Sequence, residues 1–231
     1  MKELVLDVRN LAHSYRKGTK SVDVFSQLNL QLRANEVAVV RGESGTGKTT
    51  LLLACGGMQR PLHGEILVDG IDLFSVSAAE RNKIRSAKIG YLFQTLELVP
   101  YLNVLENLTL HDRSLASKAI HWLDKFELGD RISHRPDELS HGQRQRVALM
   151  RALVHQPDLL IADEPTGNLD DRNGQIVFEI LRSYANSGGA VLIASHDSKT
   201  ETIADEVLVL NDGKLVSQGT KTSHDSETAQ V

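Results

Sequence analysis

The segment from Gly42 to Thr49 has residue types and a spacing that suit phosphate binding. Its sequence, Gly-Glu-Ser-Gly-Thr-Gly-Lys-Thr, matches the pattern G-x-x-x-x-G-K-[ST] at every defined position. Glycines let such a loop wrap around an anion with its backbone N–H groups pointing at phosphate oxygens, and a following helix adds its positive N-terminal end. We expect Lys48 to reach the β- and γ-phosphates of a nucleotide, and the hydroxyl of Thr49 to ligate Mg²⁺. The residues expected to contact the nucleotide here are Gly42, Glu43, Ser44, Gly45, Thr46, Gly47, Lys48, Thr49 and Thr50.

Two alternative interpretations of this loop are weaker. A glycine-rich turn could match by chance, but here a strand-like run, Glu36–Val40, precedes the loop and a helix-like run, Lys48–Cys55, follows it. The loop also resembles the turn that carries a hydrolase nucleophile, but that turn needs glycine where this chain has Thr46. Ser44 is therefore not expected to act as a nucleophile.

Two carboxylates, Asp163 and Glu164, directly follow the apolar run Leu159–Ala162. In open α/β sheets ligands bind outside the carboxyl ends of the strands, which is where a strand over this run would deliver both acids. We expect Asp163 to hold the same Mg²⁺ as Thr49, and Glu164 to polarise an attacking water molecule. The alternatives are structural, with Asp163 capping the following turn and Glu164 as a solvated acid.

His196 closes another strand-like run, Ala190–His196. A neutral imidazole at the carboxyl end of that strand could contact the γ-phosphate or the water beside it. Most of the nine histidines are expected to be surface or structural groups, so the position of His196 at a strand end is what favours a functional role.

The elements that must hold these groups alternate between strand and helix, which is typical of an α/β fold around a parallel sheet. The polar stretch Ser14–Asp23 is expected to be a loop between two early strands. From Leu102 to Leu128 leucines recur at roughly helical spacing, which predicts a helical lobe inserted into the α/β core. After Val216 the chain is polar, so we expect a frayed end. The period-2 residues that predict the early strands are Leu4, Leu6, Val8, Leu28, Leu30 and Leu32.

Composition and charge exclude several classes of protein. The 231 residues include 26 Lys+Arg and 30 Asp+Glu, a net charge of −4, whereas a protein that neutralises nucleic-acid backbones is normally basic. The single cysteine, Cys55, excludes an intrachain disulfide and a zinc site built on paired cysteines. No apolar run approaches the ~20 residues of a membrane-spanning helix, and the N-terminus has no apolar signal core, so we expect a soluble, non-exported protein.

Further segments complete a recognisable set of motifs. In this order and spacing, together with the phosphate loop and the two acids, they resemble the nucleotide-binding subunit of an ABC transporter over residues 4–219. The segments are Tyr91–Gln94, which looks like a Q-loop, Leu139–Gln143 like the signature motif, Thr166–Asp170 like a D-loop, and Ser195–His196 like the H-loop. A narrower resemblance is to the LolD/MacB/FtsE branch, on Pro165–Asp170, Arg135–Ser140, Phe93–Gln94, Leu98–Pro100 and Glu106–Asn107.

The resemblance implies a fold class and a domain organisation. The expected fold is α/β, with a P-loop NTPase (RecA-like) core, an N-terminal antiparallel β subdomain and an inserted α-helical subdomain. Residues 1–219 would form one nucleotide-binding domain with its helical subdomain at about 95–152, and residues 220–231 a polar, flexible tail.

The resemblance also implies ATP and Mg²⁺ as ligands, and a role for each motif residue. Tyr15 would stack on adenine, and a second copy arranged head to tail would complete each site, with two ATP molecules buried between the subunits. Catalytic roles fall to Lys48, Gln94, Glu164 and His196. The expected Mg²⁺ ligands are Thr49, Gln94 and Asp163. The residues expected to contact ATP beyond the phosphate loop are Tyr15, Ser140, Gly142, Gln143 and Asp170.

The sequence departs from the family at one position in the signature motif, which usually has glycine where this chain has His141. Because the implied contacts come from Ser140 and the backbone around Gly142, we expect His141 to be tolerated, with its effect on closure and ATPase rate left open. The segment Asn107–Ser140 is also several residues short for this branch, so a trimmed helical lobe is expected.

The function implied is that of an ATP-binding and ATP-hydrolysing subunit, which dimerises around two ATP and drives a separate membrane permease subunit with a large extracytoplasmic domain. It would be peripheral, on the cytoplasmic face of the inner membrane, and would serve to export or release a lipoprotein, peptide or drug. No nucleic-acid partner is expected. An alternative within the family is an FtsE-like ATPase that transmits a signal to cell-wall hydrolases without moving cargo.

Two alternatives come from other classes. A soluble ABC-type ATPase acting on DNA would need long coiled coils or a zinc module, and this chain has neither. A P-loop small-molecule kinase would explain the phosphate loop, but it gives no reason for Leu139–Gln143 or for His196 at a strand end.

Overall fold

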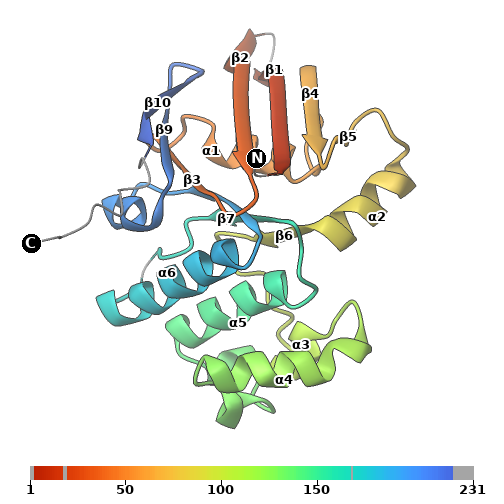
Figure 1. Ribbon diagram of the computed structural model, residues 1–231, viewed down its shortest axis with the longest axis vertical. Helices are drawn as coiled ribbons and strands as arrows, with labels where there is room; N and C mark the ends of the chain where they lie inside the picture. The colour runs from red at the N-terminus through yellow and green to blue at the C-terminus, as the bar shows by residue number, and fades with distance from the viewer. Residues whose placement is uncertain (1–2, 18–19, 168, 221–231) are drawn as a thin grey trace, which may run out of the picture.

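The alternating apolar residues of the N-terminal third form an antiparallel sheet in the computed structural model, which describes residues 3–17, 20–167 and 169–220 (Figure 1). Its four strands have the order β2-β1-β4-β5. Every neighbouring pair is antiparallel. Short connections join β1 to β2 and β4 to β5, as antiparallel pairing allows, whereas β1 and β4 are distant in the sequence. The strands are β1 (Leu4–Lys17), β2 (Lys20–Arg33), β4 (His63–Val68) and β5 (Ile71–Asp72).

A second sheet of six strands has the order β10-β9-β3-β8-β7-β6. Its members are parallel except for the antiparallel pair β9–β10 at one edge. All residues of the central strands β7 and β8 are buried, as is usual for strands covered on both faces. The strands are β3 (Val37–Arg41), β6 (Ile89–Leu92), β7 (Leu159–Asp163), β8 (Ala190–Ala194), β9 (Glu206–Asn211) and β10 (Lys214–Thr220).

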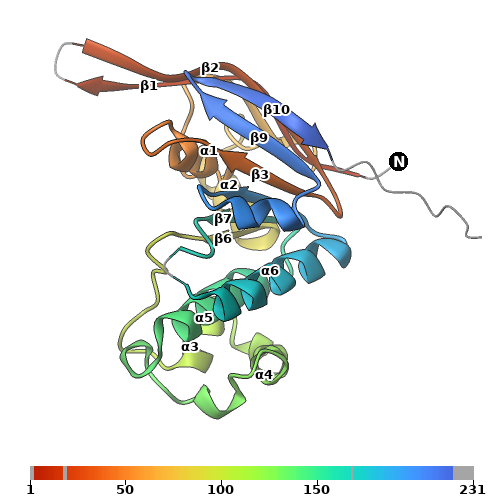
Figure 2. The same ribbon diagram turned by 90° about the vertical axis from the view of Figure 1, so that its left-hand side faces the viewer.

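The α-helices are distributed around this second sheet and below it (Figures 1 and 2). Among the described residues, short 3₁₀ turns at Arg113–Leu115, Gly129–Arg131 and Pro136–Glu138 lie between helices of the chain, and a further one, Ser198–Ile203, lies between β8 and β9. The helices are α1 (Lys48–Cys55), α2 (Ala78–Lys88), α3 (Val104–Leu108), α4 (Ala116–Lys125), α5 (His141–Leu153) and α6 (Asp171–Asn186).

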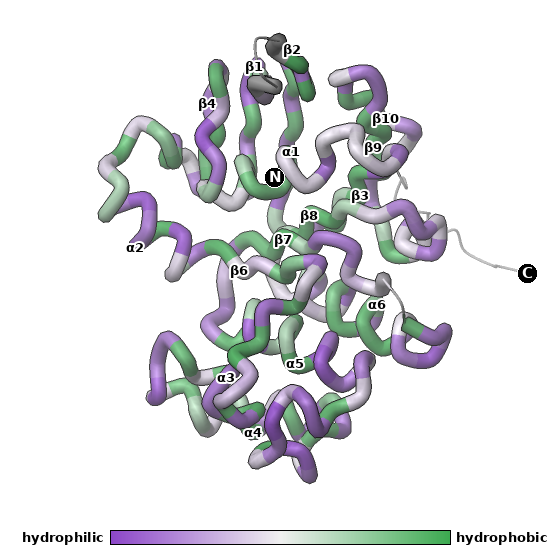
Figure 3. Tube along the Cα trace, turned by 180° about the vertical axis from the view of Figure 1, so that it is seen from behind, coloured by the Kyte–Doolittle hydropathy of each residue, from purple (hydrophilic) through white to green (hydrophobic). Residues whose placement is uncertain are grey.

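Alternate residues of the six-stranded sheet enter two different hydrophobic cores. In β3, Ala38 and Val40 pack with α1 and the antiparallel sheet, whereas Val37 and Val39 pack with α5 and α6. Period-2 alternation produces this division, because successive side chains of a strand point to opposite faces. Hydrophobic residues accordingly follow β3, β6, β7 and β8 through the middle of the molecule (Figure 3).

The helices α3, α4 and α5 lie between β6 and β7 in the chain and form a lobe with a core of its own (Figure 2). Leu123 and Leu128 are fully buried there, together with Met150 of α5. The other face of α5, including Leu149, packs on the six-stranded sheet, so this helix belongs to both cores. The α/β fold class with an antiparallel β subdomain and an inserted helical subdomain is therefore confirmed.

Two local expectations are wrong. Ser14–Asp23 was expected as a loop, but β1 continues to Lys17 and β2 begins at Lys20. This part of the hairpin lacks an apolar face to bury: Tyr15 is 47% and Val22 52% exposed, so no hydrophobic alternation marks it as strand. The chain after Val216 was expected to fray, but β10 continues to Thr220 by pairing its backbone with β9. The rest of the expected tail, residues 221–231, lies outside the described residues.

Among the parts of the chain that the structure describes, no helix combines the length and the apolar character that crossing a bilayer requires.

Candidate nucleotide site

The carboxyl ends of the parallel strands open onto a cavity of about 480 Å³. It lies where the loop after β3 meets the ends of β7 and β8, the position at which open α/β sheets bind ligands. Its lining residues are Ser44, Gly45, Gly47, Lys48, Thr49, Thr50, Gln94, Asp163, Glu164 and His196.

Glycine is required at position 47 of the phosphate loop for two reasons. Its φ of 103° lies in the left-handed region, which side chains other than glycine's rarely adopt. A Cβ there would also lie 2.3 Å from Cγ1 of Val24. Gly47 is the N-cap of α1, so this tight turn directs the first N–H groups of the helix to the cavity side of the loop.

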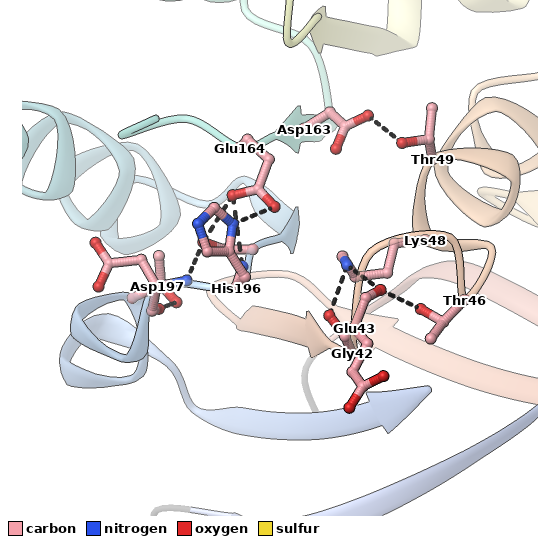
Figure 4. A network of polar contacts seen from close by, with 11 residues as sticks. Gly42, Glu43, Thr46, Lys48, Thr49, Asp163, Glu164, His196 and Asp197 are labelled. Atoms are coloured by element: carbon pink, nitrogen blue, oxygen red, sulfur yellow. Dashed lines mark hydrogen bonds and ion pairs between the residues drawn. The ribbon is translucent and has the colours of Figure 1, made fainter. Parts of the chain in front are cut away.

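The amine of Lys48 is bound to the loop's own backbone (Figure 4). Nζ donates hydrogen bonds to the carbonyl oxygens of Gly42 at 2.7 Å and Glu43 at 3.0 Å. The hydroxyl of Thr46 donates to the same Glu43 carbonyl at 3.0 Å. Gly42, Glu43 and Thr46 do not line the cavity, so in this structure they shape the loop and hold the lysine.

The side chains of Thr49 and Asp163 line the cavity and are in direct contact. The hydroxyl of Thr49 donates to Oδ2 of Asp163 at 2.8 Å, and Asp163 is 4% exposed. Burial raises the pKa of Asp163 above its ordinary value, although the hydrogen bond from Thr49 opposes this shift. One hydroxyl and one carboxylate are the oxygen ligands that Mg²⁺ prefers when nucleotide phosphates supply others. The described residues contain no group of three or more His, Cys, Asp and Glu that could hold a metal ion without such help.

Glu164 adopts an unusual backbone conformation at the end of β7. Its φ is 49°, in the left-handed region, and its N–H is bonded to the carbonyl of Ala194 at 2.9 Å. Such conformations are often found at functional sites, where surrounding structure holds them in place. The carboxylate accepts hydrogen bonds from the hydroxyl of Ser195 at 3.2 Å and the backbone N–H of His196 at 3.4 Å.

His196 contacts this carboxylate through its side chain as well. Nδ1 lies 2.9 Å from Oε1 of Glu164, while the imidazole is 74% exposed (Figure 4). The sequence placed His196 against the γ-phosphate or its water; the structure places it at the cavity wall and bound to the acid expected to polarise that water.

Two further expected residues approach the cavity from other elements. Gln94, just beyond β6, is exposed and lines it. Tyr15 of β1 does not line it, but the tyrosine hydroxyl lies 3.1 Å from the hydroxyl of Thr50, which does.

The signature-motif residues and Asp170 lie outside the cavity and cap helices. Ser140 and Gln143 form a capping box at the start of α5, with hydrogen bonds of 2.8 and 3.2 Å between backbone N–H and side-chain oxygen. Asp170 is the N-cap of α6. At Gly142, a Cβ would lie 2.6 Å from the side chain of Asn173, so glycine lets α5 and α6 approach closely.

His141, which stands where the family's signature motif usually has glycine, contacts its own chain through its side chain. Its Nε2 lies 3.4 Å from the carbonyl oxygen of Gly167 in the segment that resembles a D-loop. This is compatible with the expectation that the imidazole is tolerated, since it makes a contact within the protomer.

Two buried polar residues support the site in ways that sequence reasoning did not predict: Ser195 was named only as part of the H-loop resemblance, and Gln145 was not singled out. The hydroxyl of Ser195, which is fully buried, binds Glu164 and accepts the N–H of Asp197 at 3.0 Å. Gln145 of α5 donates to the carbonyl of Pro165 at 2.6 Å, and so connects the helical lobe to the turn after Glu164. A polar residue directly after an all-apolar strand was an available signal for Ser195, whereas nothing in the pattern of α5 marks Gln145.

Known proteins resemble this chain over most of its length. Residues 25–167 match the family described as ABC transporter. The lipoprotein-releasing system ATP-binding protein LolD of Shewanella oneidensis is 40% identical over 223 residues, which are 93% of this chain and 97% of the relative. An uncharacterized ABC transporter ATP-binding protein, YvrO of Bacillus subtilis, is 35% identical over 92% of this chain and 96% of its own.

Solved structures agree with these relatives. The dimeric structure of MJ0796, described as a bacterial ABC transporter cassette, superposes with a TM-score of 0.84 at 31% identity, over 91% of this chain and 96% of that one. A post-hydrolysis state of the same cassette, bound to ADP and Pi, gives the same values. A family match over more than half of the chain, joined to such relatives, leaves one conclusion. The chain belongs to the ABC transporter family.

Proposed function

We propose that the chain is the ATP-binding and ATP-hydrolysing subunit of an ABC transporter that releases lipoproteins from a membrane. The observation that carries the ATPase assignment is the single cavity shared by Lys48, Thr49, Asp163 and Glu164. Lys48 and Thr49 begin α1, whereas Asp163 ends β7 and Glu164 follows it, so two segments distant in the sequence supply the cation and the carboxylates that phosphoryl transfer uses. We take residues 1–219 as one nucleotide-binding domain, with the helical subdomain at about 95–152.

The phosphates of ATP would bind where the amine of Lys48 and the first N–H groups of α1 converge. Lys48 then exchanges the carbonyls of Gly42 and Glu43 for phosphate oxygens. Thr49, Asp163 and Gln94 would hold Mg²⁺, which when bound neutralises phosphate charge. Thr50 and Tyr15 lie on the side where the nucleoside would extend from the loop.

Glu164 is the group proposed to polarise the attacking water. Its carboxylate is 13% exposed, and the hydrogen bonds from Ser195 and His196 fix its direction. His196 then has two roles: its backbone N–H and ring Nδ1 orient Glu164, and its exposed ring also lies at the cavity where the γ-phosphate would sit. Positioning of this kind is the main protein contribution to phosphoryl transfer.

Ser140, Gly142, Gln143 and Asp170 support a second step in the proposal. Because they lie outside the cavity of their own chain, a second copy arranged head to tail would bring them onto its ATP. The related cassette MJ0796 is described as dimeric, which supports the dimer in this proposal. Loss of the γ-phosphate would remove the charge that joins the halves, so ATP and ADP would favour different states.

The descriptions of the relatives support the proposed cargo, and the partner and location are proposed along with it. Several are described as ATP-binding proteins of a lipoprotein-releasing system. We therefore propose a membrane permease subunit with a large extracytoplasmic domain as the partner, and the cytoplasmic face of the inner membrane as the location.

The Glu164→Gln variant tests the enzymatic proposal. It keeps the shape of the side chain but removes the carboxylate, so we expect ATP and Mg²⁺ to bind, hydrolysis to stop, and a dimer to accumulate with ATP but not with ADP. Size-exclusion chromatography and phosphate release are the measurements. Glu65→Gln, an exposed acid on β4, is the matched control. Undiminished hydrolysis by Glu164→Gln would remove this residue from its role.

The same variant tests the proposed partner. It is purified with ATP and Mg²⁺ in mild detergent, and the proteins that co-purify with it are identified by mass spectrometry. A stoichiometric membrane protein with a large extracytoplasmic domain, and ATP-dependent lipoprotein release after co-reconstitution, are expected. Co-purification with cell-wall hydrolases and no effect on lipoproteins would favour the signalling alternative. ATPase activity that responds to DNA, with no membrane partner, would contradict transport.

A further inference from the structure

A chain of polar side chains leads from the antiparallel sheet to the phosphate loop. The side-chain nitrogen Nε2 of Gln59 lies 2.7 Å from Nε2 of His13 and 2.7 Å from the hydroxyl oxygen of Tyr15. That hydroxyl lies 3.1 Å from the hydroxyl of Thr50, a lining residue of the cavity. This series of hydrogen-bonded side chains therefore ends at the nucleotide site.

The backbone brings these four residues together. His13 and Tyr15 are two positions apart on β1, so their side chains leave the strand on the same face. Gln59 lies in the turn after α1, where its N–H is bonded to the carbonyl of Leu53 at 3.2 Å. A hydrogen bond from the N–H of Leu62 to the carbonyl of Ala12, at 2.9 Å, joins this turn to β1.

The donors and acceptors of these side chains are consistent with one assignment of the hydrogen bonds. His13 is 8% exposed, and burial lowers its pKa, so its neutral ring can accept one N–H of Gln59 at Nε2. The second N–H of the same amide goes to the oxygen of Tyr15, which leaves the hydroxyl proton of Tyr15 for Thr50. The edge-to-face packing of the His13 and Tyr15 rings, with centroids 4.9 Å apart at 78°, constrains the tyrosine from the side.

Tyr15 is thus fixed at its hydroxyl end, while the residue as a whole is 47% exposed beside the cavity. An exposed aromatic face held in one orientation is what a nucleobase needs for stacking, which is worth about 1–3 kcal/mol per base in nucleic-acid complexes. We propose that Gln59, with His13 as its acceptor, is a positioning residue that holds Tyr15 as the platform for the base of the nucleotide. This inference rests on the proposed ATPase function and adds a determinant of base binding to it.

The test compares a ligand that has a base with one that lacks it. We would measure the affinities of ATP and of inorganic tripolyphosphate, each with Mg²⁺, for the wild type, Tyr15→Phe and Gln59→Met. Losing a net hydrogen bond of ordinary strength predicts binding of ATP about three- to tenfold weaker for each variant, and unchanged binding of tripolyphosphate. Tyr101→Phe, which alters an exposed tyrosine elsewhere in the molecule, is the matched control and should bind both ligands as the wild type does.

The double variant Tyr15→Phe/Gln59→Met adds a readout that a general loss of stability would not produce. Because both substitutions break the same hydrogen bond, the double variant should weaken ATP binding less than the product of the two single effects. Thermal unfolding of each variant identifies any that fail to fold.

Each failure has a distinct signature. Equal weakening of ATP and tripolyphosphate would overturn the inference, because the network would then act on the phosphate loop through Thr50. Unchanged ATP affinity in both single variants would overturn it as well. A wild type that binds neither ligand, or a Lys48→Ala variant that binds both normally, would instead contradict the proposed function itself.

Discussion

Acids near the amino ends of β7 and β9, parallel strands of the six-stranded sheet, have different partners from Asp163 at the carboxyl end of β7. At the amino end, Asp205 faces the guanidinium of Arg182 at 2.6 Å and also accepts the N–H of Val37 at 2.8 Å. Near the start of β7, Asp158 and Asp69 share the amine of Lys88. At the carboxyl end, the buried carboxylate of Asp163 accepts from a neutral hydroxyl, and burial raises its pKa.

This contrast separates residues that stabilise the fold from residues kept ready for a ligand. At the amino end, these carboxylates are paired with basic side chains of the same protein, so those groups should matter for stability and little for chemistry. At the carboxyl end, the acids and the unusual φ of Glu164 raise the free energy of the ligand-free protein, as functional sites often do. Substitutions at the two ends should therefore have opposite signatures.

The largest effect is expected for Lys48→Ala. Removing the amine deletes the cation that would bind the β- and γ-phosphates, so ATPase activity should fall roughly a hundred- to thousandfold, as when one transition-state donor is lost elsewhere. Phosphate release under saturating ATP is the measurement. Lys83→Ala, which alters an exposed lysine on α2, should keep full activity. Equal losses of ATPase activity in both variants would contradict the assignment of Lys48 to the ligand site.

Asp163→Asn should separate activity from stability. The neutral amide no longer holds a buried charge, so the ligand-free variant should gain about 1 kcal/mol of unfolding free energy, or roughly 2–4 °C in Tm for a chain of this size. ATPase activity should be lost, and added Mg²⁺ with ATP should no longer raise Tm by the wild-type amount. A lower Tm without ligand would show that this carboxylate stabilises the fold.

Arg182→Met at the opposite end should behave in the reverse way. It leaves the carboxylate of Asp205 without its guanidinium partner, so the unfolding free energy should fall by about 1–3 kcal/mol. ATPase activity per folded molecule should be unchanged. Urea unfolding and activity on the same samples check both statements, and a selective loss of activity would contradict the assignment of this end to stability.

The smallest effect concerns pH at the same end. Hydrogen bonds to Asp69 and Asp158 raise the pKa of Lys88 to about 12, above the value of about 10.4 for an unperturbed lysine. The stabilisation is therefore complete below about pH 10.4 and is lost as the pH rises towards 12. The side chain of Lys88 is about a third exposed, so this stabilisation should amount to only roughly 0.5 kcal/mol.

Lys88→Arg provides the comparison, because arginine keeps its charge in this range. Unfolding free energies of the wild type and this variant, measured in urea from about pH 9 to 11.5, should diverge as the wild type weakens. Parallel curves would show that this lysine contributes nothing measurable.

The sequence predicts the position of this site better than the contacts within it. Asp163 and His196 lie at the ends of strand-like runs, and Lys48 follows such a run, near the end of the phosphate loop, so parallel pairing brings them to one edge. The support from Ser195 and Gln145 depends on packing between elements distant in sequence, which no local pattern reveals. The extension of β1 and β2 through Ser14–Asp23 was missed for a related reason: a hairpin exposed to solvent needs no apolar alternation.

The hydrogen bonds of Lys48 to its own loop make phosphate binding an exchange rather than a simple addition. The residue is only 9% exposed, so much of the dehydration of its amine is complete before any ligand arrives. An incoming oxygen must displace the carbonyls of Gly42 and Glu43, and a charged phosphate does so because its hydrogen bond to an ammonium group is stronger than a neutral carbonyl's. A nucleoside without phosphates offers no such competitor. The loop thus favours ligands that carry a charged phosphate, independently of contacts to the base. An uncharged nucleoside leaves the hydrogen bonds of the lysine to its own loop intact.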